Sequence, residues 1–376
     1  MTQGQLGQAC GLSQSAVSRL EKRGTGAYST DVLAAAAAHL NIPAAWVGLA
    51  ARNGTENVER REFLGAVAMA AVPPVLAALP SADSGQAPAL RLSTTAYRRL
   101  DASTSSRDLM DPVQSHLRLI QTIAQGASVA QRSRLAAVGS EASSLAGWLA
   151  WDMGDHGSAR TWYGSAIKAA RSSGDPLLAA YQAGSLAQFE AHAGNATQAL
   201  GLAANARLSL GAQRPAIADA WLSSVEALAH AAAGDRHAAD RALIASRAAA
   251  ERAPLEELPP WPWVFAFDET KVAACRVTCG AHLGLPDWVL SDDTAALNTG
   301  HAKQRALLVL DIAAGHMAAG RHDAAFALAS RAVDTAVRYR SGRIVERARA
   351  LRRTLTTSTP PKVVREFDER LHDVYL

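Results

Sequence analysis

The stretch from Gly147 to Ala170, GWLAWDMGDHGSARTWYGSAIKAA, decides the fold, because its spacing of small residues returns further along the chain. A glycine that follows a helical run recurs at Gly154, Gly194, Gly234 and Gly320. Five residues later the chain has alanine each time, at Ala159, Ala199, Ala239 and Ala325. Small residues at fixed offsets on paired helices indicate that the helices cross closely. The units should therefore stack into an antiparallel helical solenoid.

Composition supports an all-α fold. The chain has 376 residues, enough for two or more domains, and 49% of them are hydrophobic, which excludes a disordered protein. Aromatic residues make up only 5% and alanine is abundant, so helices are favoured over sheets. The formal charge of +4 permits a nucleic-acid partner without requiring one. Three cysteines cannot build a disulfide framework, and no secretory signal opens the sequence, so we expect a cytoplasmic protein.

The N-terminal stretch CGLSQSAVSRLE, Cys10 to Glu21, has the pattern of a turn followed by a helix. Gly11 suits the tight turn, and Ser13 is a good N-cap for the helix. Val17 and Leu20 fall on one face of that helix. The opposite face carries Gln14, Ser15, Ser18 and Arg19. Such polar groups at the start of an exposed helix can hydrogen-bond base edges and phosphates in a major groove.

The segment Thr2–Ala50, in which this stretch lies, resembles the Cro/C1-type (phage-repressor-like) helix-turn-helix domain of bacterial regulators. The resemblance implies a double-stranded DNA partner, with Gln3 on a phosphate. It also implies base contacts from Gln14, Ser15 and Arg19, flanked by Ser13 and Ser18. The alternative is an amphipathic helix pair whose polar face is only solvated. The first helix of that family, which would precede Thr2, is absent here, so we expect either a natural start further upstream or impaired DNA affinity.

The repeated units resemble tetratricopeptide repeats, although their 40-residue spacing exceeds that family's by about six residues. The order of parts is similar to a group of helix-turn-helix/tetratricopeptide regulators from high-GC bacteria. We expect a helix-turn-helix domain at 1–54, an inter-domain helix and linker at 55–100, and the repeat domain with capping helices at 101–376.

Three further segments allow two interpretations each. The run Glu59–Pro80 carries a twin-arginine-like start, but it is too short and too broken by prolines to span a membrane, so we expect an inter-domain helix and no membrane partner. Prolines and tryptophans in Ala253–Phe265 interrupt the stack, which favours a packed connection over a lid. The arginine-rich run Arg338–Arg353 favours the solvated face of a terminal capping helix over a phosphate contact.

No pattern for chemistry is present. Cys275, Cys279 and His282 share a helix face, yet structural zinc wants four ligands with a turn between pairs, and buried cysteines are the commoner case. We therefore expect no metal and no cofactor. The sequence lacks a catalytic triad order, a phosphate-binding glycine loop and paired carboxylates, so we do not expect an enzyme.

A groove is the more informative feature. The tetratricopeptide resemblance implies that the first helix of each pair lines a concave face. The positions that this implies include Trp148, Trp151, Asp152, Tyr181, Gln188, His192 and Trp221. Aromatic walls with few hydrogen-bonding groups suit a peptide or an apolar small molecule. The alternative is that the tryptophans simply pack between helices.

These patterns favour a DNA-binding transcriptional regulator whose solenoid senses an effector or makes protein contacts. We expect a homodimer, because relatives gain affinity by pairing on two half-sites. The alternative is an interaction scaffold with a vestigial helix-turn-helix that does not bind DNA.

Overall fold

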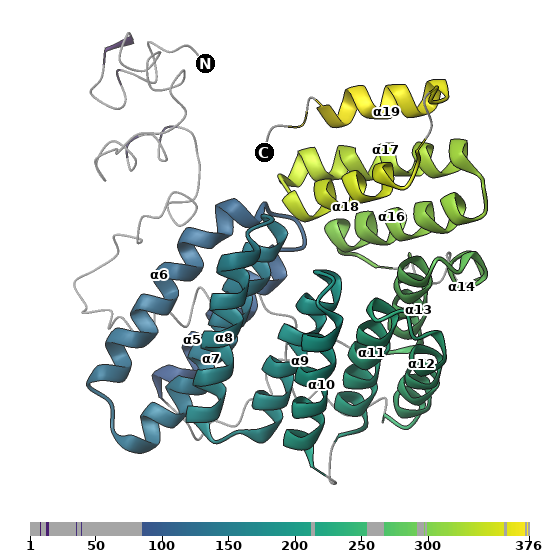
Figure 1. The fold of residues 1–376 in the computed structure, drawn as a ribbon. Coiled ribbons are helices and arrows are strands. Elements are labelled where there is room, and N and C mark those ends of the chain that lie inside the picture. Colours follow the sequence, from purple (N-terminus) through teal and green to yellow (C-terminus); the bar gives the residue numbers. More distant parts are fainter. Residues whose placement is uncertain are drawn as a thin grey trace. The chain divides into compact units, whose positions relative to one another are not determined.

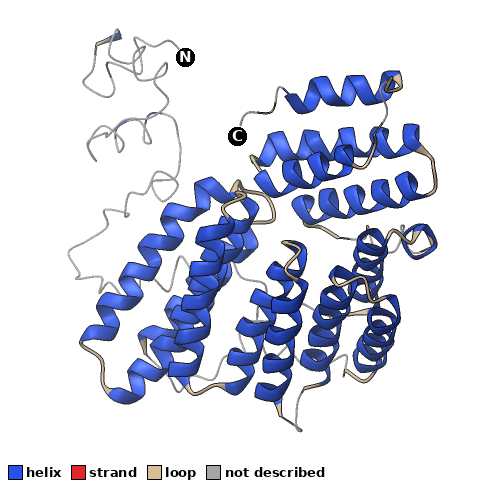
Figure 2. Cartoon of the chain, viewed as in Figure 1, coloured by secondary structure: helices blue, strands red, loops and turns tan. Residues whose placement is uncertain are grey.

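The computed structural model describes residues 85–211, 215–253, 267–291, 297, 299–356, 359–372 and 374, with isolated positions 8, 13, 14, 35 and 39. The chain divides into two units, Met1–Ser81 and Ala82–Leu376. Every element of regular structure in the described residues is a helix, and fourteen helices follow one another in the second unit (Figures 1 and 2). None of these helices is long and apolar enough to cross a membrane.

Helical hairpins form the body of the second unit, as the repeat offsets predict. Their helices run α7 (Val129–Asp152) to α8 (His156–Ser173), α9 (Pro176–His192) to α10 (Ala196–Leu210), α11 (Ala216–Ala232) to α12 (Arg236–Glu251), and α16 (Ala302–Ala318) to α17 (His322–Tyr339). The repeated glycines make the turns. Their φ angles are +84°, +82°, +77° and +73° at Gly154, Gly194, Gly234 and Gly320, a left-handed conformation that glycine adopts without strain.

An aspartate after two of these glycines starts the next helix. The Asp155 carboxylate accepts from the Ser158 backbone N–H at 2.9 Å, and the Asp235 carboxylate accepts from the Ala238 N–H at 2.9 Å. Each bond satisfies one of the four N–H groups that a helix start leaves unpaired. The Gly-Asp pair therefore both reverses the chain and caps the second helix of the hairpin.

Small residues let the paired helices approach. The alanines five positions after the turn glycines are all fully buried. A Cβ atom at Gly147 would lie 3.1 Å from the Tyr163 ring, so a larger residue would push the two helices apart. Hydroxyls reinforce the crossing in two hairpins: Ser140 donates to the Ala166 carbonyl and Ser246 to the Ala220 carbonyl, both at 2.8 Å. Ser140 and Ala220 occupy equivalent positions of first helices, and Ala166 and Ser246 equivalent positions of second helices. The donor therefore lies on the first helix in one hairpin and on the second helix in the other.

The remaining helices extend the row at both ends and fill the space between the α11–α12 hairpin and the α16–α17 hairpin. They are α5 (Gln86–Leu100), α6 (Ser106–Gln125), α13 (Glu269–Leu283), α14 (Pro286–Leu290), α18 (Gly342–Arg353) and α19 (Lys362–His372). α5 lies in the stretch 55–100, for which an inter-domain helix and linker were expected, and it packs on α7. α13 and α14 lie between the third of these hairpins and the last. α19 packs on α17, so the arginine-rich α18 is not the last helix.

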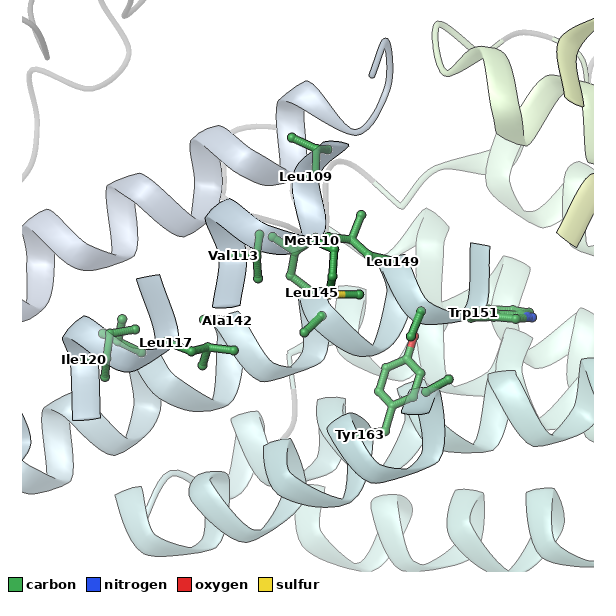
Figure 3. Close-up of a cluster of buried hydrophobic side chains, with 14 of the residues drawn as sticks. Leu109, Met110, Val113, Leu117, Ile120, Ala142, Leu145, Leu149, Trp151 and Tyr163 are labelled. Carbon is green, nitrogen blue, oxygen red and sulfur yellow. The ribbon is translucent and has the colours of Figure 1, made fainter. Parts of the chain in front are cut away.

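The core runs between successive hairpins rather than forming one central cluster. Figure 3 shows its first part, where Leu145 and Leu149 of α7 meet Val113 and Leu117 of α6. Tyr163 and Phe189 continue this cluster into the next hairpin. Burying each such side chain contributes about 1.5–3 kcal/mol, so each hairpin depends on its neighbours for stability.

The row of hairpins bends back so that its first and last parts touch. The start of α18 lies against the turn after α7, and the contact is between backbones. A methyl group on Gly342 would overlap the carbonyl oxygen of Met153. Glycine is therefore required at this junction because no side-chain atom fits.

Candidate ligand cavity

A cavity of about 460 Å³ lies on the inner face of the row of hairpins. Its walls come from the first helix of every hairpin and from α5, α13 and α18, whereas the second helices α8, α10, α12 and α17 contribute none of its lining residues. This volume is within the range of about 300–1,000 Å³ that small-molecule sites occupy.

One side of the cavity is aromatic. Tyr181 and Trp221 are stacked, with ring centroids 4.9 Å apart and an interplanar angle of 30°. Trp221 sits over Gly184, where a Cβ atom would approach the indole to 2.5 Å. Trp148 donates its indole N–H to the Asp101 carboxylate at 2.8 Å. Leu145, Val225, Leu228, Leu307 and Leu308 complete the apolar surface. The rings are thus held in place by packing, and Trp148 also by its hydrogen bond to Asp101.

Most of the groove residues implied by the sequence reach this cavity. It is lined by Trp148, Tyr181, Gln188, His192 and Trp221. Burial is the main reason why the pKa of His192 lies well below its usual value, and the nearby positive charge of Arg343 lowers the pKa further. The imidazole is therefore neutral at pH 7 and presents a polar but uncharged group.

Trp151 and Asp152 correct the groove prediction, because both are buried, each only 3% exposed, and neither lines the cavity. Trp151 packs edge-on against Phe189, with ring centroids 5.4 Å apart, and the guanidinium of Arg343 covers it at 3.4 Å. The cause is α18, whose first turn lies over this end of α7. Repeat spacing alone carries no information about a helix that returns from the end of the chain.

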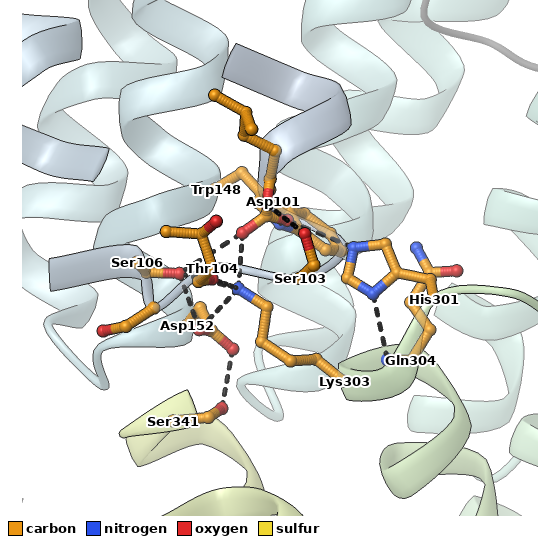
Figure 4. A network of polar contacts seen from close by, with 12 residues as sticks. Asp101, Ser103, Thr104, Ser106, Trp148, Asp152, His301, Lys303, Gln304 and Ser341 are labelled. Atoms are coloured by element: carbon orange, nitrogen blue, oxygen red, sulfur yellow. Dashed lines mark hydrogen bonds and ion pairs between the residues drawn. The ribbon is translucent and has the colours of Figure 1, made fainter. Parts of the chain in front are cut away.

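A buried polar network closes the row of hairpins at this point (Figure 4). Lys303, at the start of α16, is 2% exposed and lies between the carboxylates of Asp101 and Asp152. Its ammonium group also donates to the Ser106 hydroxyl at 3.0 Å. Asp152 accepts from Ser341 at 2.6 Å and from Ser106 at 2.7 Å. The network, which we call the clasp, joins α5, α6, α7, α16 and the start of α18.

Asp101 belongs to both the clasp and the cavity wall. Burial by itself would raise its pKa, but a hydrogen bond from His301 and the charge of Lys303 outweigh burial and lower the pKa to about 2. His301 Nδ1 faces the Gln304 backbone N–H at 3.4 Å, and Nε2 lies 3.2 Å from the Asp101 carboxylate. The amide can only donate, so Nε2 carries the ring hydrogen and donates it to Asp101. Asp101 is therefore ionised and fully engaged.

The arginine-rich α18 is also more than a solvated face. Arg347 pairs with Asp311, which is 3% exposed and also accepts from Thr278 at 2.8 Å. Arg352 pairs with Asp368 of α19 at 2.6 Å. Arg343 points to the cavity. The spacing of four residues between Arg343 and Arg347 indicates that both lie on one face of the helix. The residues that they contact lie on other helices and cannot be predicted from this spacing.

The cysteines and the DNA-reading residues have separate outcomes. Cys275 lines the cavity and Cys279 is buried, with 3.9 Å between their sulfur atoms. No group of three or more potential metal ligands occurs in the part of the chain that the structure describes. Ser13 and Gln14 are exposed. Gln3, Ser15, Ser18 and Arg19 lie outside the described residues, as do Cys10, the run Glu59–Pro80 and most of Ala253–Phe265.

Comparison of the chain with protein-family models and with curated proteins gave no match. The function of the chain is therefore inferred from the cavity, the clasp and the sequence patterns.

Proposed function

We propose that the chain is a DNA-binding transcriptional regulator whose tetratricopeptide-like repeats bind a small effector in the cavity. The observation that carries the effector half is the cavity itself, whose aromatic wall and engaged polar groups exist before any ligand arrives. The DNA-binding half depends on the helix-turn-helix pattern in Thr2–Ala50.

The clasp favours a small effector over a folded protein partner. Because α18 meets the turn after α7, the inner face is bounded rather than open along its length. A volume of about 460 Å³ accepts a small molecule or a few peptide residues, but not another domain. The scaffold alternative needs an accessible concave surface, so the cavity supports it less well.

The clasp also offers a physical route for regulation. Asp101 of the clasp and His301, which is hydrogen-bonded to it, both line the cavity, so a ligand that touches them changes the free energy of closing the row of hairpins. A ligand shifts such an equilibrium only if it binds the closed and open arrangements with different affinity. The expected readout is an effector-dependent change in DNA affinity.

DNA binding is tested with sequences selected by the full chain from a random duplex library. Gln14→Ala or Arg19→Ala should cost about 1–3 kcal/mol at one operator position, because each side chain can form paired hydrogen bonds with a base. Gln3→Ala should weaken all sequences alike. Arg353→Ala, at an exposed arginine of α18, is the control. Absence of salt-sensitive DNA binding by the wild-type chain would refute this half of the proposal.

Assembly is tested in the same samples. A single recognition helix covers few base pairs, so we expect a homodimer on two half-sites about one helical turn apart. Light scattering that gives a monomer with and without operator DNA would contradict the expectation.

A further inference from the structure

Arg343 is a cation on the cavity wall that no polar group of the described residues binds. In the described residues it forms neither a hydrogen bond nor an ion pair, and its contacts are with the rings of Trp151 and Trp148, 3.4 and 5.1 Å from the guanidinium carbon. Arg98, also on the wall, donates to the Glu141 carbonyl oxygen at 3.0 Å. A guanidinium normally uses its five donors on carboxylates, carbonyls or water. Arg343 therefore has donors to offer to a ligand.

The carboxylates on the wall are already engaged. Asp101 is bound by Lys303, Trp148 and His301. Asp311 is bound by Arg347 and Thr278. Neither can turn to Arg343 without giving up the cation that it already binds, Lys303 or Arg347. The side chain remains protonated, since burial lowers the pKa of Arg343 only to about 10.

Stacking leaves the guanidinium in a favourable orientation for an anion. The contact with Trp151 uses the flat face of the group, so its N–H bonds point outward in the plane of the guanidinium. Two parallel N–H bonds match the two oxygens of a carboxylate. Lys271, a half-buried lysine on the same wall, has no ion pair with a described residue and adds a second positive charge.

The remaining lining residues determine which kind of group can fill the uncharged part of the cavity. The stacked rings of Tyr181 and Trp221 and the indole of Trp148 offer aromatic surface, and leucine and valine side chains fill the space between them. Such surface favours an apolar or aromatic group, because burying it releases water from both sides.

We propose that the cavity binds a small organic carboxylate with an apolar or aromatic body, held at its charged end by Arg343. The body lies along Trp148, Tyr181 and Trp221. The inference rests on the proposed function only in taking the cavity as a ligand site, and it does not depend on DNA binding.

The test uses matched probes with the full chain. Benzoate, 2-naphthoate and indole-3-acetate are each compared with the corresponding primary amide by calorimetry and tryptophan fluorescence. Each amide has nearly the shape of its acid but lacks the charge. We expect the carboxylates to bind about tenfold more tightly than the amides, because charge-assisted paired hydrogen bonds are the stronger ones.

Variants assign the preference to one side chain. Arg343→Gln should bring carboxylate and amide to similar affinity, whereas Arg343→Lys, which keeps the charge but not the fork, should retain part of the preference. Arg353→Gln, at an exposed arginine of the same helix, should change nothing. Circular dichroism shows whether each variant is folded. If Arg343→Gln does not fold, the preference of the wild-type protein and the result with Arg343→Lys decide.

Each result separates the two proposals. Equal binding of acids and amides by the wild-type protein, or a preference that survives Arg343→Gln, overturns the carboxylate site and leaves a ligand cavity in place. Failure of every probe to bind at millimolar concentration overturns the cavity as a ligand site, while DNA binding by the same protein would stand.

Discussion

Replacing Lys303 by methionine should open the clasp. The change removes the only cation that the clasp contains among the described residues and leaves the carboxylates of Asp101 and Asp152 buried together, 3% exposed each. Methionine has nearly the length of lysine, so packing changes little and the effect is chiefly electrostatic. The contact between α16 and the first helices should weaken most.

The size of the effect follows from the pKa of Asp101. His301 and Lys303 overcome burial and hold the pKa at about 2 instead of 3.8, a net stabilisation of the carboxylate of about 2.5 kcal/mol. Lys303 supplies part of this and also neutralises Asp152. Removing one partner from a buried ion pair costs about 3–5 kcal/mol. We expect a loss of about 3 kcal/mol in the free energy of unfolding at pH 7.

The pH dependence of the free energy of unfolding provides a second, independent test of the clasp. In the wild-type protein the lowered pKa of Asp101 contributes stability that is present above about pH 4 and lost as the pH falls through about 2. Without Lys303, burial dominates and the pKa of Asp101 rises above its unfolded value. The native variant then binds a proton that the unfolded chain does not. The difference in free energy of unfolding between the wild-type protein and the variant should therefore become smaller as the pH falls from 7 towards 4.5.

The assay is denaturant unfolding followed by circular dichroism and tryptophan fluorescence. Lys168→Met, at an exposed lysine of α8, is the matched control and should change the free energy by less than about 0.5 kcal/mol. The double variant Lys303→Met with Asp101→Asn should recover part of the loss, because one buried charge is removed. A single Lys303→Met variant within about 0.5 kcal/mol of wild type at pH 7 would refute the clasp.

Three smaller changes test the hairpins and their junction by the same unfolding assay. Gly342→Ala should cost about 1–3 kcal/mol because its methyl group overlaps Met153, whereas Gly164→Ala, inside α8 and with open space, should slightly stabilise the protein; equal effects would contradict the contact. Gly234→Ala should cost about 1 kcal/mol for its φ of +77°, and Gly201→Ala, inside α10, should stabilise the protein; a harmless Gly234→Ala would count against the left-handed turn. Burial raises the pKa of Glu141 to about 7, and the charges of Arg91 and Arg98 offset burial only in part. The free energy of unfolding should therefore fall by up to about 3 kcal/mol as the pH rises from 4.5 to 8. Glu141→Gln should remove this pH dependence. An unchanged slope in this variant would show that other groups cause it.

The sequence by itself determined the hairpins, because turns and helix pairs depend on neighbours close along the chain. Gly154 and Asp155 reverse the chain and cap the next helix wherever the rest of the protein lies. Alanine at a fixed offset from the turn decides how closely two helices pack. The same local logic put Tyr181 and Trp221 at equivalent positions of successive first helices, and the structure stacks them on one wall.

Only the tertiary structure decided where the row of hairpins ends. Each hairpin is rotated slightly against the one before it, and these small rotations add up along the row. No local pattern therefore reveals that Lys303 reaches Asp101, about two hundred residues away, or that Gly342 meets Met153. For the same reason Trp151 could be read as part of the groove, although Arg343 covers it. The arginine that covers Trp151 also faces the cavity, and its role became visible only once the first and last helices were seen to meet.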